Sequence, residues 1–345
     1  MPSLAETRIC VQQIAPKDKQ LFSNIVCESC SNPEIVQKLQ AAFWIKKIWS
    51  PGASIKIAFL GEPTNVRRTP LRLLSDPNYP GQPLDPIQLE IEELSIKDAL
   101  KKICNERIVP ITNLDIKFVE DPSEANVRIG FDVSQGTWSN VGTDCLEIKD
   151  PTKPTMNFTW FDTPTAIHEF GHMIGMVHEH QNPKNNIEWD KEKIYQWGAA
   201  TQGWDKETTD VNIIEQYNVD IYNSTIYDPC SVMIYSLPAG LTLNNMSIPG
   251  NLRLSALDVE WISEMYPGGK KPVTFYSKIY QIDFSENKAY CIEKSKKQQN
   301  SSEILPTDMT WVYIIISMVL VFTITFAIMF IIYQTKKANK VRLFR

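Results

Sequence analysis

Three histidines at fixed spacing constrain this chain more than any other feature. His168 and His172 stand four residues apart, and His178 follows six residues later, in a chain of 345 residues that holds only four histidines. Residues 163–172 are typical of a helix, with Thr163 as the expected cap and Pro164 as the first helical residue. Residues four apart on a helix share one face, so both imidazoles can reach a single metal ion.

Glu169 and Gly175 complete the pattern H-E-x-x-H-x-x-G-x-x-H. Gly175 stands where the helix must end and the chain reverse, a position that favours a residue that tolerates positive φ. The reversal can bring His178 back toward the helix as a third ligand. Three neutral nitrogen ligands leave one position of a zinc ion open for water, which is typical of a catalytic site. The pattern predicts one catalytic Zn²⁺ ion on the three histidines, with Glu169 as general base. His180 lies outside this spacing, and we expect it beside the ligands or at the surface.

Further segments resemble one family of zinc enzymes. The extended motif resembles the metzincins, and the segments around it are similar to the astacin-like zinc metallopeptidases. The matching features are Glu179 directly after the third histidine, Gly136–Gly142 (G-x-W-S-x-V-G), Ser231–Tyr235 (the Met-turn, S-x-M-x-Y), Leu254–Val259 (L-S-x-x-D-V) and the pair Met265-Tyr266. The resemblance covers residues 49–267.

The resemblance implies a fold, an activity and several residue roles. The fold class would be α+β: a metzincin-type peptidase domain with a twisted, mostly parallel sheet, two long helices, the Met-turn and a C-terminal helix. The enzyme would be a zinc-dependent metalloendopeptidase that acts on proteins or peptides. Met233 would form an apolar base under the zinc ligands, Tyr235 would stabilise the oxyanion, and Glu179 would meet a new N-terminus formed on activation. Leu146–Lys149 would be the edge strand that aligns the substrate.

Hydrophobic periodicity predicts the elements ahead of the zinc helix. Alternating residues indicate strands at Ser54–Leu60, Leu114–Val119 and Ala125–Phe131, and helical spacing indicates one helix over Ile87–Ile103. The order strand, helix, strand, strand is also that of the family.

The cysteines depart from the family pattern. Astacins carry cysteines where this chain has Thr137, Pro154 or Thr155, and Pro267, so both family disulfides are expected to be absent. Their loss fits a reducing compartment or a branch that never needed them. Cys27 and Cys30 form a single C-x-x-C pair, which we interpret as incidental thiols because no second pair follows at zinc-ribbon spacing.

The remaining chain divides into flanking segments. Residues 1–48 are an N-terminal extension that could be a propeptide, a partner-binding segment or solvated chain. Residues 268–310 are typical of a stalk, with one strand-like piece at Val273–Phe284. Residues 311–333 form an uncharged apolar run that is long enough to cross a membrane as a helix. Residues 334–345 are a basic tail. We therefore expect a single-pass membrane protein.

Two arguments about membrane orientation disagree. Five basic residues after the apolar run favour a cytoplasmic tail with the bulk of the chain outside, whereas a lone C-terminal span without a signal peptide is typical of a tail-anchored protein with a cytoplasmic bulk. Four N-x-S/T sequons, at Asn157, Asn223, Asn245 and Asn300, would suit a lumenal face but carry little weight in deciding the orientation.

A net charge of −5 from 35 basic and 40 acidic residues argues against a nucleic-acid partner.

The main hypothesis is a membrane-tethered zinc endopeptidase. One alternative is a tethered binding or adhesion protein on the same scaffold without turnover, which would be marked by the loss of Glu169 or a ligand, and none is lost. A second alternative is another zinc hydrolase that uses the same ligands.

Overall fold

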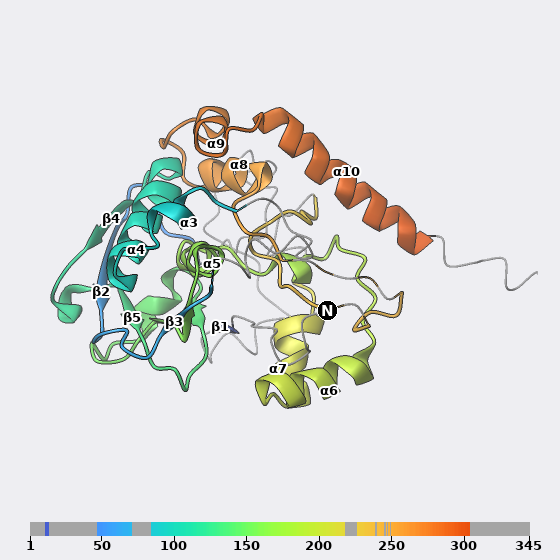
Figure 1. Cartoon of the computed structure of the whole chain (residues 1–345), viewed down its shortest axis with the longest axis horizontal. Coiled ribbons are helices and arrows are strands. Elements are labelled where there is room, and N and C mark those ends of the chain that lie inside the picture. Colours follow the sequence, from blue (N-terminus) through green and yellow to red (C-terminus); the bar gives the residue numbers. More distant parts are fainter. Residues whose placement is uncertain are drawn as a thin grey trace, which may run out of the picture. The chain divides into compact units, whose positions relative to one another are not determined.

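The computed structural model describes residues 11–13, 47–70, 84–217, 226–238, 240–244, 246, 248 and 250–303. The chain divides into two units, Met1–Lys297 and Gln298–Arg345, and nearly all described residues belong to the first. The strands are β1 (Val11–Gln13), β2 (Ser54–Phe59), β3 (Arg67–Arg68), β4 (Asp115–Phe118), β5 (Val127–Gly130), β6 (Trp138–Asn140), β7 (Met156–Asn157) and β8 (Trp160–Phe161). The α-helices are α3 (Ile87–Glu90), α4 (Ile96–Ile103), α5 (Thr163–Met173), α6 (Lys191–Gln202), α7 (Lys206–Thr209), α8 (Ala256–Met265), α9 (Pro272–Tyr280) and α10 (Phe284–Glu303) (Figure 1).

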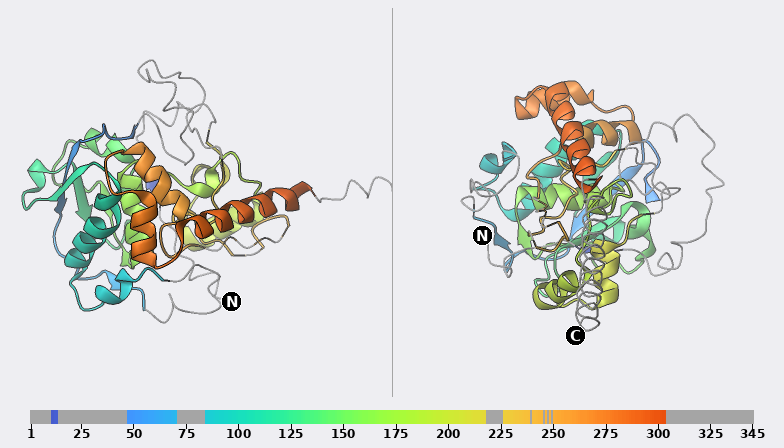
Figure 2. Two further views of the ribbon diagram at one scale, coloured as in Figure 1. Left: turned by 90° about the horizontal axis from the view of Figure 1, so that it is seen from above. Right: turned by 90° about the vertical axis from the view of Figure 1, so that its right-hand side faces the viewer.

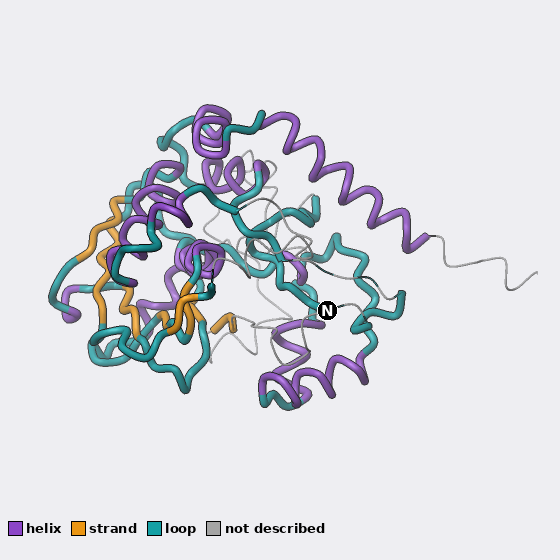
Figure 3. The backbone as a smooth tube through the Cα atoms, viewed as in Figure 1, coloured by secondary structure: helices purple, strands orange, loops and turns teal. Residues whose placement is uncertain are grey.

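The main sheet has the strand order β1-β6-β7-β5-β2-β4. Every neighbouring pair is parallel except β6 and β7, which are antiparallel, so the predicted mostly parallel sheet is confirmed. The strands predicted at Ser54–Leu60, Leu114–Val119 and Ala125–Phe131 are β2, β4 and β5. Figure 3 shows the strands gathered in one part of the molecule, while the part that holds α6 and α7 consists of helices and loops.

The single helix predicted over Ile87–Ile103 is wrong, because it is two helices. α3 ends at Glu90, and α4 begins only after Ser95, whose side chain accepts a hydrogen bond from the backbone N–H of Asp98. Ser95 has extended backbone angles (φ −58°, ψ 156°), so it caps the second helix instead of continuing the first. A π-helical turn, Cys104–Ile108, prolongs α4.

One large apolar core joins the sheet to α4, α5, α8 and α9. Ten of the eleven residues of α5 are buried, so this helix lies inside the core rather than on it. The helices α8 and α9 lie side by side in the views of Figures 1 and 2. A second apolar cluster, around Ile194 and Trp197 of α6, packs against residues of the 234–248 segment.

The edge strand expected at Leu146–Lys149 is wrong. A 3₁₀-helix, Gly142–Glu147, takes the first half of that segment, the second half is irregular, and the strand that lies toward the sheet edge is β6. β6 contacts the zinc-motif helix α5. Gly142 (φ 50°) follows β6 and begins the 3₁₀-helix, so the strand comes earlier in the chain than the resemblance implied.

The segment after residue 267 is helical where a strand-like piece was predicted. Residues 273–280 fall in α9, residues 281–283 connect the two helices, and Phe284 begins α10. Phe275, Tyr276, Tyr280 and Phe284 are buried in the main core, as is Cys291 further along α10. The apolar residues that alternate like a strand therefore lie on the buried faces of helices, and this part of the expected stalk packs on the catalytic unit.

Several predictions fall on residues outside the described ranges. These are the apolar run 311–333, the basic tail 334–345, the cysteines Cys27 and Cys30, and most of the extension 1–48. Among the described residues, none of the helices combines the length and the apolarity needed to cross a bilayer.

Candidate active site

The helix α5 presents the first two histidines. Its N-cap is Asp162, whose side chain accepts the backbone N–H of Thr165, so the predicted cap at Thr163 is off by one residue. Pro164 lies in the first turn, where its missing N–H costs no hydrogen bond. His168 and His172 therefore share one face of a helix that is anchored at its start.

Gly175 reverses the chain as predicted. Its φ is 97°, a value that favours glycine, and its backbone N–H donates to the carbonyl oxygen of His172 at 2.9 Å. The next residue, Met176, donates its N–H back to Gly171 at 2.9 Å. The chain thus turns tightly against the end of α5 and returns His178 to the other two histidines.

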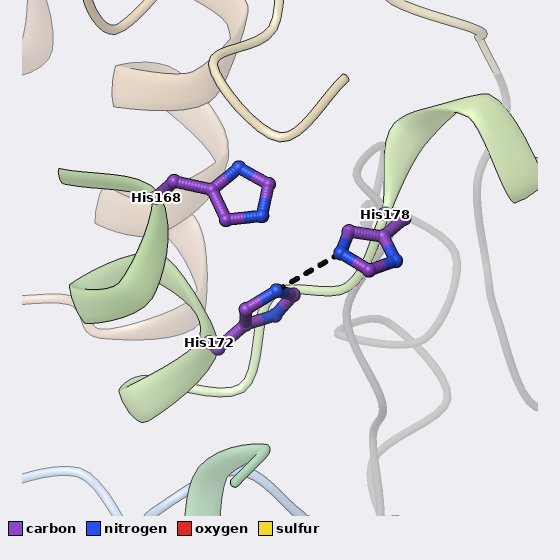
Figure 4. Close-up of side chains that lie close together, drawn as sticks. All are labelled: His168, His172 and His178. Atoms are coloured by element: carbon purple, nitrogen blue, oxygen red, sulfur yellow. Dashed lines mark hydrogen bonds between the residues drawn. The ribbon is translucent and has the colours of Figure 1, made fainter. Parts of the chain in front are cut away.

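The three predicted ligands converge (Figure 4). The ring centroid of His172 lies 4.7 Å from that of His168 and 4.7 Å from that of His178. One nitrogen from each ring can be chosen so that all three lie within 4.8 Å of one another. The Nε2 atoms of His172 and His178 are 3.1 Å apart, close to the ~3.3 Å expected for two nitrogen ligands ~2.05 Å from one tetrahedral zinc ion.

The hydrogen bonds of the imidazoles fit a zinc ion. The Nδ1 atom of His168 lies 2.9 Å from the carbonyl oxygen of Val232, and that of His172 lies 2.9 Å from the carbonyl oxygen of Met176. These contacts orient the rings with Nε2 toward the centre, the arrangement typical of zinc-bound histidine. The Nε2 atom of His168 is buried and has no hydrogen-bond partner among the described residues.

Burial keeps the ligands neutral. It lowers the pKa of His168 to about 4 and the pKa of His172 and His178 well below the ordinary histidine value. Neutral imidazole is the form that binds zinc. The three histidines can therefore hold one zinc ion with no proton to displace near neutral pH.

The Met-turn lies against the zinc-motif helix. A Cβ atom added to Gly171 would stand 2.6 Å from the Sδ atom of Met233, so the methionine side chain packs directly on α5 at the turn between the two helical ligands. The carbonyl oxygen of Met233 accepts the backbone N–H of Glu179 at 3.0 Å, which ties the residue after His178 to the same turn.

The ring of Tyr235 lies beside the predicted ligands. The ring centroid of Tyr235 is 4.2 Å from that of His178 and 6.1 Å from that of His168. Glu169 is fully buried on α5. His180 is not at the surface: it is buried, its Nε2 lies 3.0 Å from the carbonyl oxygen of Asn212, and its ring stacks on Tyr235 with centroids 4.4 Å apart.

Glu179 is buried behind the ligands. Its Oε1 accepts hydrogen bonds from the side-chain amide of Asn182 at 2.7 Å and from the backbone N–H of Asp228 at 2.8 Å. Burial raises its pKa well above the ordinary glutamate value. Glu179 thus joins the segment after the third histidine to the segment that leads into the Met-turn.

The sequence analysis did not assign a role to Asp258. Its carboxylate accepts hydrogen bonds from the Ser231 hydroxyl at 2.6 Å and from the Val232 N–H at 3.0 Å, and it closes a capping box with Ser255 at the start of α8. The spacing Ser255-x-x-Asp258 is a capping-box pattern, so the cap could have been found from sequence. Its contact with the Met-turn could not, because the two segments are far apart in the chain.

Comparisons with known proteins agree with this geometry. The family model described as Astacin, a family of peptidases, matches residues 95–266. A solved structure of myroilysin is 30% identical, with a TM-score of 0.53, over 66% of this chain and 99% of the myroilysin chain. A second myroilysin crystal structure is 27% identical, with a TM-score of 0.45, over 78% of this chain and 94% of its own.

A further match is the high choriolytic enzyme 1, a hatching enzyme zinc-protease from the medaka fish Oryzias latipes, which is 14% identical with a TM-score of 0.34 over 66% of this chain and 98% of its own. No curated protein sequence matches the chain. The family assignment depends on the family model and on the first myroilysin structure. With the motif, its folded geometry and these two matches in agreement, the chain belongs to the astacin family and is a zinc metalloendopeptidase.

Proposed function

We propose that the chain cleaves peptide bonds in proteins with Glu169 as general base and Tyr235 as the residue that stabilises the oxyanion. The observation that carries this proposal is the placement of Glu169 on the helix α5, between the two ligands His168 and His172, in a fully buried position. When bound to the three histidines, zinc lowers the pKa of a water molecule and polarises the carbonyl of the substrate.

The side chains of this chain would carry the proton transfers. The Glu169 carboxylate accepts the proton of the attacking water and then donates it to the nitrogen of the leaving amine. The Tyr235 hydroxyl donates a hydrogen bond to the negatively charged oxygen of the tetrahedral intermediate. His180, stacked on the Tyr235 ring, limits the positions that the phenol can take.

A comparison of variants tests the general base. We expect Glu169→Gln to bind one zinc per chain as the wild type does and to cleave an unfolded protein about 10²–10⁴-fold more slowly. The matched control is Glu192→Gln, an exposed glutamate of α6 in a solvent-accessible ion pair with Lys206, which should keep full activity. Equal activity of Glu169→Gln and Glu192→Gln would remove Glu169 from the mechanism. Zinc binding without cleavage, both by the wild type and by the chain shortened to residues 47–345, would favour the non-catalytic binding protein instead.

The N-terminal segment is proposed to cover the substrate edge of the sheet. β1 pairs in parallel with β6, with Val11 opposite Trp138 and Gln13 opposite Asn140. An extended substrate that adds a strand to this edge would need the same backbone groups of β6. The strand β1 would therefore have to leave this edge, or be removed with residues 1–46, before a substrate binds there.

The segment 311–333 is proposed to tether the enzyme to a membrane, which would confine it to substrates near that membrane. The supporting feature is its uncharged apolar sequence, followed by a basic tail. Deletion of residues 311–345 should move the protein from the membrane fraction to the soluble fraction of a cell lysate. Deletion of residues 334–345 alone is the control and should leave it in the membrane fraction. A membrane-bound protein after the longer deletion would overturn the tether.

A further inference from the structure

Two cysteine thiols meet behind the active site. Cys230 directly precedes Ser231, the first residue of the Met-turn, and Cys291 lies on α10. Both are fully buried and both are free thiols in the structure. The two sulfur atoms and a carboxylate oxygen of Asp228 lie within 4.8 Å of one another, and the Cys291 thiol donates to the Asn287 side-chain oxygen at 3.7 Å.

Polar contacts along α10 hold Cys291 close to Cys230. Asn287 accepts the backbone N–H of Ala256 at 3.0 Å, and Lys288 pairs with Glu260 at 2.6 Å, so α10 is joined to α8. One turn beyond Cys291, the Lys294 side chain donates to the carbonyl oxygen of Pro229 at 3.4 Å. These contacts lie on both sides of Cys291 and fix its position over Cys230.

The cluster of Asp228, Cys230 and Cys291 has the residue types of a metal site, but its hydrogen bonds and protonation disfavour metal binding. The two oxygens of Asp228 already accept hydrogen bonds from the Cys230 N–H at 2.8 Å and from the Ser255 hydroxyl at 2.6 Å. The hydrogen bond with Cys230, together with burial, raises the pKa of the Cys291 thiol far above its ordinary value. A metal would require two thiolates and an ionised carboxylate in this buried place, whereas a bond between the sulfurs requires no charge at all.

We propose that Cys230 and Cys291 form a disulfide that fastens α10 to the Met-turn. The oxidant is a small-molecule disulfide such as oxidised glutathione. One protein thiolate attacks it to give a mixed disulfide and releases the first glutathione thiolate. The second protein thiolate then attacks the protein sulfur of the mixed disulfide and releases the second glutathione. One S–S bond forms and one breaks, and the two protons of the protein thiols end on the two reduced glutathione molecules.

Burial determines when the bond forms. Neither sulfur is reached by solvent in the folded chain, so the exchange takes place before α10 docks or while it is transiently open. Once formed, the bond closes the chain between residues 230 and 291, a segment that contains α8 and α9. It constrains the unfolded chain and keeps α10 on the turn that supports the zinc ligands.

Mapping of the disulfide tests the proposal directly. The full chain is purified in a mild detergent, equilibrated with reduced and oxidised glutathione during refolding, blocked with N-ethylmaleimide and digested with trypsin. We expect the peptide 289–294, which carries Cys291, to be linked to the peptide 207–253, which carries Cys230, and the link to disappear after treatment with a reductant. Both thiols found alkylated under oxidising conditions, or Cys291 linked to a different cysteine, would overturn the proposal.

Thermal unfolding gives a second measurement that does not depend on peptide recovery. The oxidised wild type should unfold about 5–10 °C above the reduced wild type. Cys291→Ala should lose this difference, while Cys104→Ala, which removes a buried thiol on the π-helical turn after α4, should keep it. A second zinc ion per chain that is lost in Cys291→Ala, in place of a linked peptide, would identify a metal site and refute the disulfide.

Discussion

The Nδ1 atom of His168 lies 2.9 Å from the carbonyl oxygen of Val232, so a zinc ligand on α5 is oriented by the backbone of the Met-turn. The N–H of Val232 in turn donates to Asp258 at 3.0 Å. A carboxylate on α8 therefore positions a histidine that it does not touch. Hydrogen bonds to the ring nitrogen that does not bind the metal set both the tautomer and the orientation of a ligating imidazole.

The first prediction concerns this chain of contacts. Asp258→Asn keeps the size of the side chain but removes one of its two acceptor oxygens, so Val232 and Ser231 are held less firmly. We expect zinc affinity to fall about 10–100-fold, measured by competition with a chromogenic chelator. Ser263→Ala on the same helix, whose hydroxyl donates to the Val259 carbonyl oxygen within that helix, is the control and should retain wild-type affinity. Equal affinity of the two variants would contradict the positioning role of Asp258.

The second prediction concerns the contact between Gly171 and Met233. A methyl group at residue 171 would approach the Met233 Sδ atom to 2.6 Å, and Met233 is itself buried, so Gly171→Ala should lower the free energy of unfolding by about 1–3 kcal/mol. Met233→Ala removes the obstructing sulfur. The double variant should therefore be less destabilised than the sum of the single variants by about 1 kcal/mol or more, measured by urea unfolding. Additive losses would show that the two side chains do not meet.

The third prediction concerns Tyr235. Tyr235→Phe removes the hydroxyl and keeps the ring, which packs against His178 and stacks on His180, so the fold and zinc binding should be retained. We expect kcat to fall about 10²–10³-fold with a small change in KM, because the lost hydrogen bond forms mainly in the transition state. Tyr195→Phe on α6, whose hydroxyl bonds to Asp210, is the matched control. A loss confined to KM would assign Tyr235 to substrate binding instead.

The fourth prediction concerns residues 1–46. Their removal uncovers the edge of β6, since β1 pairs with that strand, and leaves the buried ion pair of Lys47 with Asp144 in place. We expect faster cleavage of an unfolded protein by the shortened chain. Deletion of residues 1–8 keeps Val11–Gln13 and should leave the rate unchanged. If both deletions give the rate of the full chain, β1 does not obstruct the substrate.

The fifth prediction concerns pH. Burial raises the pKa of Asp228 and of Asp258, and their mutual repulsion raises the pKa of Asp228 further. An aspartate in the unfolded chain ionises near pH ~3.9. Above that pH the folded chain holds protons that the unfolded chain has released, so the contribution of this pair to the free energy of unfolding falls as pH rises, until the folded carboxyls ionise.

Asp228→Asn should flatten this dependence. In acid, Asp228→Asn should have a lower free energy of unfolding than the wild type, because it loses an acceptor for the Ser255 hydroxyl. As pH rises above about 4, this difference in the free energy of unfolding should shrink. Urea unfolding of both proteins across this range, at equal zinc concentration, measures the difference. A difference that is constant or grows with pH would mean that the Asp228 pKa is not raised in the folded chain.

Some elements were predictable from local patterns. The strands β2, β4 and β5 follow from alternating side chains, and the turn at Gly175 follows from the need for positive φ. The break at Ser95 was missed because the apolar spacing continues across it, while the cap between Ser95 and Asp98 is a local polar contact that competes with the helix. The helix α9 was missed because its aromatic residues also fit an alternating pattern.

The sequence by itself determined which histidines converge. His168, His172 and His178 lie within eleven residues, and their spacing on a helix followed by one reversal suffices to bring them together. Only the tertiary structure decided what surrounds them. The contacts of Val232 with Asp258, of Met233 with Gly171 and of Cys230 with Cys291 join segments that are distant in the chain. Such contacts depend on how buried helices and turns pack against one another, and no local spacing in the sequence records that packing.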